Sequence, residues 1–88
     1  MTTSDYRPID CDMHSMLELL ALQRSAVTVR AVDEHQAAIV IEGTVSDVYT
    51  RDRAEYLELR DAAGDIFAVR LDRLRAIYDA AGVQIWRQ

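Results

Sequence analysis

The chain has 88 residues, of which half are hydrophobic, one is proline and three are glycine, so its composition predicts one ordered domain with a single modest core. This domain is expected to span residues 1–88, with the polar residues 1–5 flexible. A chain of this size is too small for an active-site cleft between two lobes, so we expect a binding module in preference to an enzyme. Ten arginines and no lysines face fifteen carboxylates, and the net charge of -5 argues against nonspecific binding to phosphate backbones. We therefore expect a positively charged partner in preference to a nucleic acid.

The compartment follows from cysteine usage and hydropathy. The single cysteine, Cys11, rules out an internal disulfide, and no apolar run follows a basic start at the N-terminus. No stretch approaches the roughly 18 apolar residues that a membrane-spanning helix needs. We therefore expect a soluble, cytoplasmic protein that makes no contact with a membrane, and we expect a monomer.

The negative charge is concentrated near the N-terminus. Residues 1–18 carry a net charge of -3, whereas the remaining seventy residues carry -2. Such carboxylates either are solvated charges that favour the N-terminus of a helix or form a contact surface for cationic side chains. The residues alone favour the first interpretation, because runs of charge are usually solvated faces.

The chain opens with an extended lead-in and a helix. Pro8 restricts Arg7 to extended geometry. The next apolar residues fall at the offsets of one helical face: Met13, Met16, Leu17 and Leu20. Asp12 is a candidate for the N-cap, and Ser15 and Glu18 are spaced as a second possible capping box. The helix is expected to end near Gln23 or Arg24.

Most of the remaining sequence alternates with a period of two, which predicts short strands. A first strand starts at Ala26 and is followed by a turn at 33–36. A second strand spans 37–45, where Gly43 would allow a sharp bend. The further expected elements are a polar loop containing residues 50–53, a hairpin of strands 56–60 and 66–71 around the loop 61–64, and a last strand at 83–86.

The segment 71–81 is ambiguous. Its apolar residues match one face of a helix that Gly82 would end, but alternation alone cannot settle its structure. About five short strands after one helix favour an α+β fold that is mostly β. We expect an N-terminal helix followed by a small, strongly bent antiparallel barrel that closes its own edges.

Cys11 and His14 are the residues most open to a chemical interpretation. They have the spacing of half a metal site, but a closed zinc site needs four ligands and the other histidine, His35, lies in a predicted turn. A buried cysteine at the start of a helix is the favoured interpretation. The same pair is a weak candidate for a nucleophile and a base, because nothing obvious orients the histidine. We expect no metal, no cofactor, no catalytic residue and no enzymatic activity.

The aromatic residues are assigned to the core or to the rim of the barrel: Tyr6, Tyr56, Phe67 and Trp86. A platform that stacks bases would normally lie beside a basic groove, and this chain lacks an excess of positive charge. Direct binding of nucleic acid is therefore not expected.

Four stretches of the sequence, in this order and spacing, resemble the Rho-binding antiterminator family. They are Tyr6-Arg7-Pro8-Ile9-Asp10-Cys11-Asp12, Leu17-Glu18, Glu55-Tyr56-Leu57 and Val69-Arg70-Leu71-Asp72. The resemblance implies an Sm-like barrel preceded by a helix, in a protein that binds the primary RNA-binding sites of the Rho hexamer and lowers termination. It also implies a turn at Leu74, a strand near 76–78 and a turn at 79–82 in the ambiguous segment.

The resemblance further implies which residues contact Rho. The first candidates match the family around the signature and the helix, and they are Asp10, Asp12 and Glu18. A second group lies in the loop that corresponds to a polar contact loop of the family: Arg51, Asp52 and Arg53. Relatives often carry another acidic residue in the first helical turn, where this chain has His14 and Ser15. The alternative function is an Sm-like barrel that binds RNA directly or acts as a general protein-interaction module.

Overall fold

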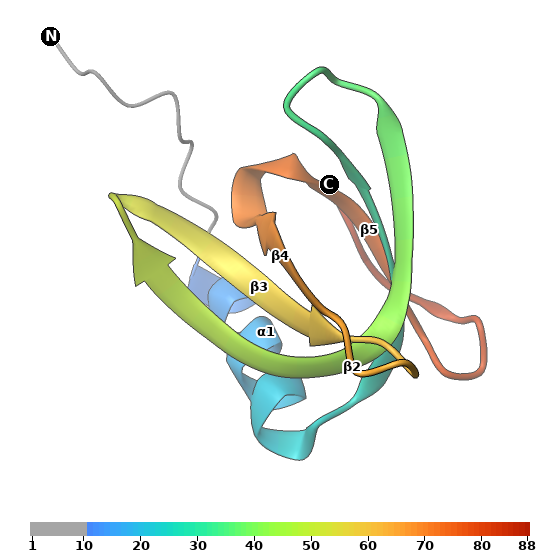
Figure 1. Ribbon diagram of the computed structural model, residues 1–88. Helices are drawn as coiled ribbons and strands as arrows, with labels where there is room; N and C mark the ends of the chain where they lie inside the picture. Colours follow the sequence, from blue (N-terminus) through green and yellow to red (C-terminus); the bar gives the residue numbers. More distant parts are fainter. Residues whose placement is uncertain (1–10) are drawn as a thin grey trace, which may run out of the picture.

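The computed structural model describes residues 11–88, which form one helix followed by a six-stranded antiparallel sheet (Figure 1). The elements are α1 (Cys11–Gln23), β1 (Ala26–Val32), β2 (Ala38–Arg51), β3 (Ala54–Arg60), β4 (Ile66–Arg70), the 3₁₀ turn η1 (Leu71–Arg73), β5 (Leu74–Asp79) and β6 (Gln84–Arg87). The strand order in the sheet is β4-β3-β2-β1-β5-β6. The expectation of a mostly β fold with a leading helix is confirmed.

Helix α1 ends as expected but begins two residues earlier than an N-cap at Asp12 implies. Because Cys11 is already helical, Asp12 lies within the first turn, and the prediction that Asp12 is the N-cap is wrong. At the other end, Arg24 adopts a left-handed conformation with a φ of 51°. The Arg24 N–H donates to the carbonyl of Ala21 at 3.2 Å and the Ser25 N–H to that of Leu20 at 3.0 Å. These two bonds satisfy the last helical carbonyls in the way that usually places glycine at this position.

Strand β2 belongs to both halves of the bent sheet, because it pairs with β1 through its first part and with β3 through its second. A Cβ added to Gly43 would lie 2.7 Å from the carbonyl oxygen of Arg60, so the two backbones approach more closely there than another residue allows. Ser46 is an extra residue in the pairing with β3, and this bulge adds to the bend. The irregularity in β2 lies at Ser46, three residues beyond Gly43, and β2 continues to Arg51 instead of ending at Val45.

Three hairpin loops in the described part of the chain share one hydrogen-bond pattern, and we call them the Asp-capped loops. They begin at Asp33, Asp61 and Asp79. In each loop the aspartate Oδ1 accepts backbone N–H groups from the second and fourth following residues at 2.8–3.0 Å. The residue three positions after the aspartate has a positive φ: Gln36 at 65°, Gly64 at 88° and Gly82 at 83°. This combination of a turn and a left-handed residue is a common way to join neighbouring antiparallel strands.

The core lies between α1 and the inner side of the sheet. Its fully buried side chains are Leu17, Val29, Val45, Leu57, Leu59, Leu71, Leu74 and Ile77. Each contributes about 1.5–3 kcal/mol relative to an exposed position. Of the aromatic residues assigned to the core or rim, Trp86 packs against the core and Phe67 is 39% exposed, while Tyr6 lies outside the described residues.

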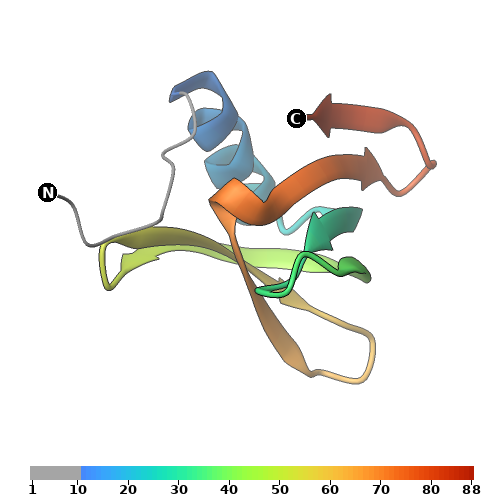
Figure 2. The same ribbon diagram turned by 90° about the horizontal axis from the view of Figure 1, so that it is seen from above.

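The sheet is strongly bent, but within residues 11–88 no strand pair closes it into a barrel. Strands β4 and β6 are its two edges, so the predicted closure of the edges is not found. The chain itself spans the opening, because β4 leads through η1 into β5 and both Leu71 and Leu74 are fully buried there. Seen from above, α1 lies on one side of β2 and β3, and the β3–β4 loop extends on the other (Figure 2).

The segment 71–81 contains a turn and a strand, as the family resemblance implies. The strand starts at Leu74 instead of near 76, and the last strand starts at Gln84, one residue later than expected. The helix-like spacing of Leu71 and Leu74 has a local cause: η1 has three residues per turn, so residues three apart share a side.

Candidate functional site

The predicted contact residues fall at two places on the described surface. Asp12 and Glu18 project from α1, whereas Arg51, Asp52 and Arg53 form the end of the β2–β3 hairpin. All five of these residues are exposed. Asp10 lies outside the described residues.

The two α1 carboxylates face solvent because the opposite side of the helix is in the core. Met13 and Leu17 are buried, and they fix which way the helix is turned. Asp12 lies in the first helical turn, where the partial positive charge of the helix N-terminus favours a carboxylate. The Glu18 side chain is 61% exposed and remains available to a cation from another molecule.

His14 connects α1 to the β2–β3 hairpin. Its Nε2 lies 2.6 Å from Oε2 of Glu55, near the start of β3, and its Nδ1 lies 3.4 Å from Oε1 of Glu18. A neutral imidazole donates from one nitrogen only, whereas an imidazolium donates from both and satisfies both carboxylates. The three side chains form a continuous row from the helix to the hairpin. Glu55 was missed as a site residue from the sequence, since only the fold brings it to His14.

The end of the β2–β3 hairpin is a two-residue loop, shorter than the predicted loop at 50–53. Arg51 still pairs with Ala54, and only Asp52 and Arg53 are unpaired. Their φ values are 50° and 66°, as in a type I′ turn, whose preferred residues are Asn-Gly or Asp-Gly. A left-handed arginine costs about 1–2 kcal/mol. The loop contributes one carboxylate and one cation, and Arg51 at the end of β2 adds a second cation, so the candidate site is mixed in charge and not uniformly acidic.

Two of the stretches that carry the family resemblance are neighbours in the sheet. Tyr56 pairs across the strands with Tyr49 on one side and with Arg70 on the other. The tyrosine rings stack with centroids 5.5 Å apart at an interplanar angle of 22°. The Arg70 guanidinium donates to both carboxylate oxygens of Asp72 at 2.7 and 2.9 Å, which fixes η1 against β4. These residues therefore have a clear structural role.

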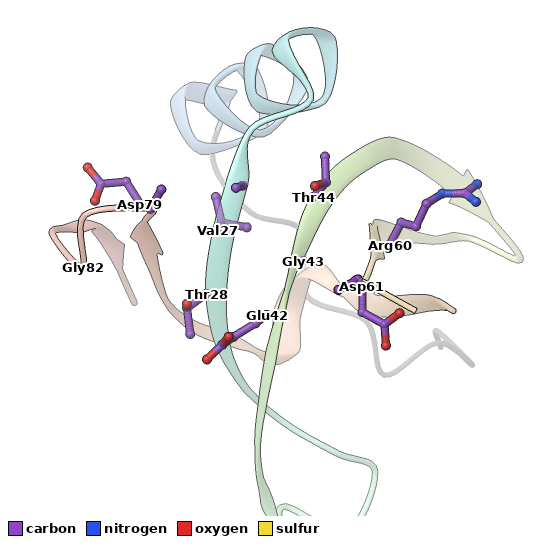
Figure 3. Close-up of a pocket in the computed structure, with 12 residues that line it drawn as sticks. Val27, Thr28, Glu42, Gly43, Thr44, Arg60, Asp61, Asp79 and Gly82 are labelled. Carbon is purple, nitrogen blue, oxygen red and sulfur yellow. The ribbon is translucent and has the colours of Figure 1, made fainter. Parts of the chain in front are cut away.

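A groove lies over β1 and β2, between the loops that start at Asp61 and Asp79, and has a volume of about 510 Å³ (Figure 3). Thr28 and Glu42, which pair across the strands, lie in it. Oδ1 of Asp61 and Oδ1 of Asp79 each accept backbone N–H groups of their own loop, so these two carboxylates have a structural role.

In the described part of the chain, no three His, Cys, Asp or Glu side chains are grouped to hold a metal ion. The side chain of Cys11 is not among those described, so its predicted burial stays a prediction. None of the helical segments within residues 11–88 is long and apolar enough to cross a membrane.

The chain is similar to known proteins over the helix and most of the sheet. Residues 8–85 match the family model described as "Modulator of Rho-dependent transcription termination (ROF)". The chain is also similar to "Protein rof" of Escherichia coli (strain K12) and "Protein rof" of Shigella flexneri. Each is 32% identical over 69 residues, which are 78% of this chain and 76% of the relative. The family match includes both α1 and the β2–β3 hairpin.

Proposed function

The chain belongs to the ROF family of modulators of Rho-dependent transcription termination, and we propose that it is a non-catalytic inhibitor that binds Rho and excludes RNA. It acts in the cytoplasm, as a monomer, at the primary RNA-binding site of Rho. The proposed contact residues are Asp10, Asp12 and Glu18, with Arg51, Asp52 and Arg53 as a second group. The observation that carries this proposal is the pair of exposed α1 carboxylates beside a hairpin that His14 and Glu55 join to the helix.

Competition with RNA follows from charge. A groove that binds RNA is basic because it neutralises phosphates, and carboxylates on a rigid helix complement the same groove. The attraction is between largely exposed groups, so added salt weakens it.

The environment of two arginines supports a protein partner over RNA. Arg70 is paired with Asp72, and the Arg75 guanidinium donates to two backbone carbonyls and to Gln88 at 2.9–3.1 Å. These two cations are therefore engaged within the chain. We propose no direct binding of nucleic acid.

The finer description of the fold is also a proposal: the bent sheet is a small barrel of the Sm-like kind. The sharing of β2 by both halves of the sheet and the passage of the chain from β4 through η1 into β5 support it.

A matched pair of charge reversals tests the contact surface. The variant Asp12→Lys/Glu18→Lys changes the two α1 carboxylates, and Glu34→Lys/Glu42→Lys makes the same change in net charge at two other exposed positions. We expect the α1 variant to bind Rho at least about tenfold more weakly at low salt and the control to stay within about threefold of the parent chain. Circular dichroism checks that both variants are folded.

The outcomes separate the function from the site. If the parent chain does not bind Rho at low salt, the proposed function is wrong. If it binds and both variants lose affinity equally, α1 is not the contact surface.

A further inference from the structure

The outer face of the β2–β3 hairpin carries four side chains in a two-by-two arrangement, and we call them the outer-face patch: Asp47, Tyr49, Tyr56 and Glu58. Asp47 pairs across the strands with Glu58, and Tyr49 pairs with Tyr56. Leu57, between Tyr56 and Glu58, is fully buried, so these two neighbours face the opposite side of the sheet. Side chains paired in this way lie about 5 Å apart across the strands and about 7 Å apart along them.

Two carboxylates directly opposite each other destabilise a sheet through repulsion. Neither Asp47 nor Glu58 forms an ion pair with a cation within residues 11–88. The neighbour of Glu58 on β4 is Ala68, which is too small to cover it and has no charge. The pair therefore provides no internal electrostatic benefit to the described part of the fold.

One oxygen of each carboxylate is already held in place. Oδ1 of Asp47 accepts the Val48 N–H at 2.8 Å, and Oε1 of Glu58 accepts the Ser46 hydroxyl at 2.9 Å. These bonds restrict the rotation of the two side chains. The second oxygen of each has no hydrogen-bond partner among the described residues and can accept a donor without further ordering.

The stacked tyrosines lie beside the carboxylates on the same face of the hairpin. Both tyrosines are half-buried, and their ring centroids are 5.5 Å apart. A guanidinium stacks on an aromatic ring and donates to carboxylates, which a phosphate cannot do. Arg70 is next to Tyr56 on β4 but is engaged with Asp72, so this arginine is not available to the patch.

We propose that the outer-face patch binds an arginine side chain of the protein partner. The guanidinium donates to the second oxygens of Asp47 and Glu58, and its plane lies against the tyrosine pair. The inference rests on the proposed function in one respect, since it takes Rho as the partner. The outer-face patch would be a second contact with the partner. It lies on one face of the hairpin, and Glu55 contacts α1 from the other face.

The test measures Rho binding and stability together. The variant Asp47→Asn/Glu58→Gln removes both charges and keeps the size of the side chains. The control Glu42→Gln/Asp65→Asn removes the same charge from two other exposed residues. We expect the patch variant to lose about tenfold or more in affinity, because charge-assisted bonds to guanidinium are lost. Its urea midpoint should rise, since the like-charged pair is gone, while the control stays within about twofold in affinity.

A loss of affinity for Rho together with a rise in the urea midpoint excludes misfolding as the cause of lost binding. If the parent chain binds Rho and the patch variant binds equally well, the inference is overturned and the proposed function stands. Equal loss in the patch variant and the control also overturns the inference, because net charge then explains the result. Absence of binding by the parent chain overturns both.

Discussion

The three Asp-capped loops and the β2–β3 loop join neighbouring strands in different ways. Each Asp-capped loop is held by a carboxylate that accepts two backbone N–H groups, and two of the three have glycine at the left-handed position. The β2–β3 loop has no such carboxylate bond and places Asp52 and Arg53 at positive φ. The difference shows that local bonding fixes three loops, whereas the fourth keeps exposed charges in a conformation that they do not favour.

Strain of this kind at an exposed, charged loop is compatible with a binding role. The long pairing of β2 with β3 holds the loop in place, and the Glu55–His14 contact connects its base to α1. The Asp-capped loops are therefore expected to govern stability, and the β2–β3 loop is expected to govern recognition.

The largest expected effect on stability comes from removing a capping carboxylate. Asp79→Ala leaves two backbone N–H groups without their acceptor, and we expect a loss of about 1–3 kcal/mol in the free energy of unfolding. Asp52→Ala, the matched change in the β2–β3 loop, should alter it by less than about 0.5 kcal/mol. Urea denaturation of both variants provides the measurement. Equal losses would remove the distinction between the two kinds of loop.

A glycine in the β2–β3 loop should separate stability from recognition. Arg53→Gly relieves the left-handed arginine but increases the freedom of the unfolded chain, so we expect a net gain of about 0.5–1 kcal/mol. We also expect weaker binding to Rho by about threefold, as for the loss of one exposed charge at an interface. Calorimetry and a Rho titration measure the two effects.

The matched control for this substitution lies in an Asp-capped loop. Gln36 occupies the left-handed position that glycine fills in the other two loops. Gln36→Gly should give a similar gain of about 0.5–1 kcal/mol with no change in affinity for Rho. A loss of affinity in this variant would contradict the assignment of recognition to the β2–β3 loop.

The smallest effect concerns the pH dependence of one Asp-capped loop. The backbone N–H groups of Ala37 and His35 lower the pKa of Asp33 below its ordinary value of 3.8. A lowered pKa in the folded state means that the contribution to stability is complete above the ordinary pKa and is lost as the pH falls through the folded value. Asp33→Asn should therefore reduce the difference in urea midpoint between neutral pH and about pH 2. An unchanged difference would show that this carboxylate does not contribute.

Much of the fold was predictable because the periodicity and the turn residues agree. The hairpin around 61–64 combines alternating strands with a glycine at the left-handed position, and both are visible in the sequence. The end of β2 was not predictable in the same way. The bulge at Ser46 leaves Val45 and Val48 on the inner side, which breaks the period of two. The sequence Asp52-Arg53 also lacks the Asn-Gly signal of its turn type.

The candidate site was only partly predictable for a related reason. The exposed α1 carboxylates follow from the helical pattern and the family resemblance. The contact between His14 and Glu55, and the pairing of Asp47 with Glu58, depend on the packing of the helix and the register of the strands. Neither is encoded in the spacing of residues along the chain.

The most direct test of the central claim is competition between this chain and RNA for Rho. A labelled single-stranded RNA is bound to Rho at low salt, and the chain is titrated in while RNA anisotropy is followed. We expect complete displacement of the RNA, with a midpoint that rises in proportion to the RNA concentration and with added salt. Simultaneous binding of the chain and RNA, with no displacement at saturation, would contradict the account.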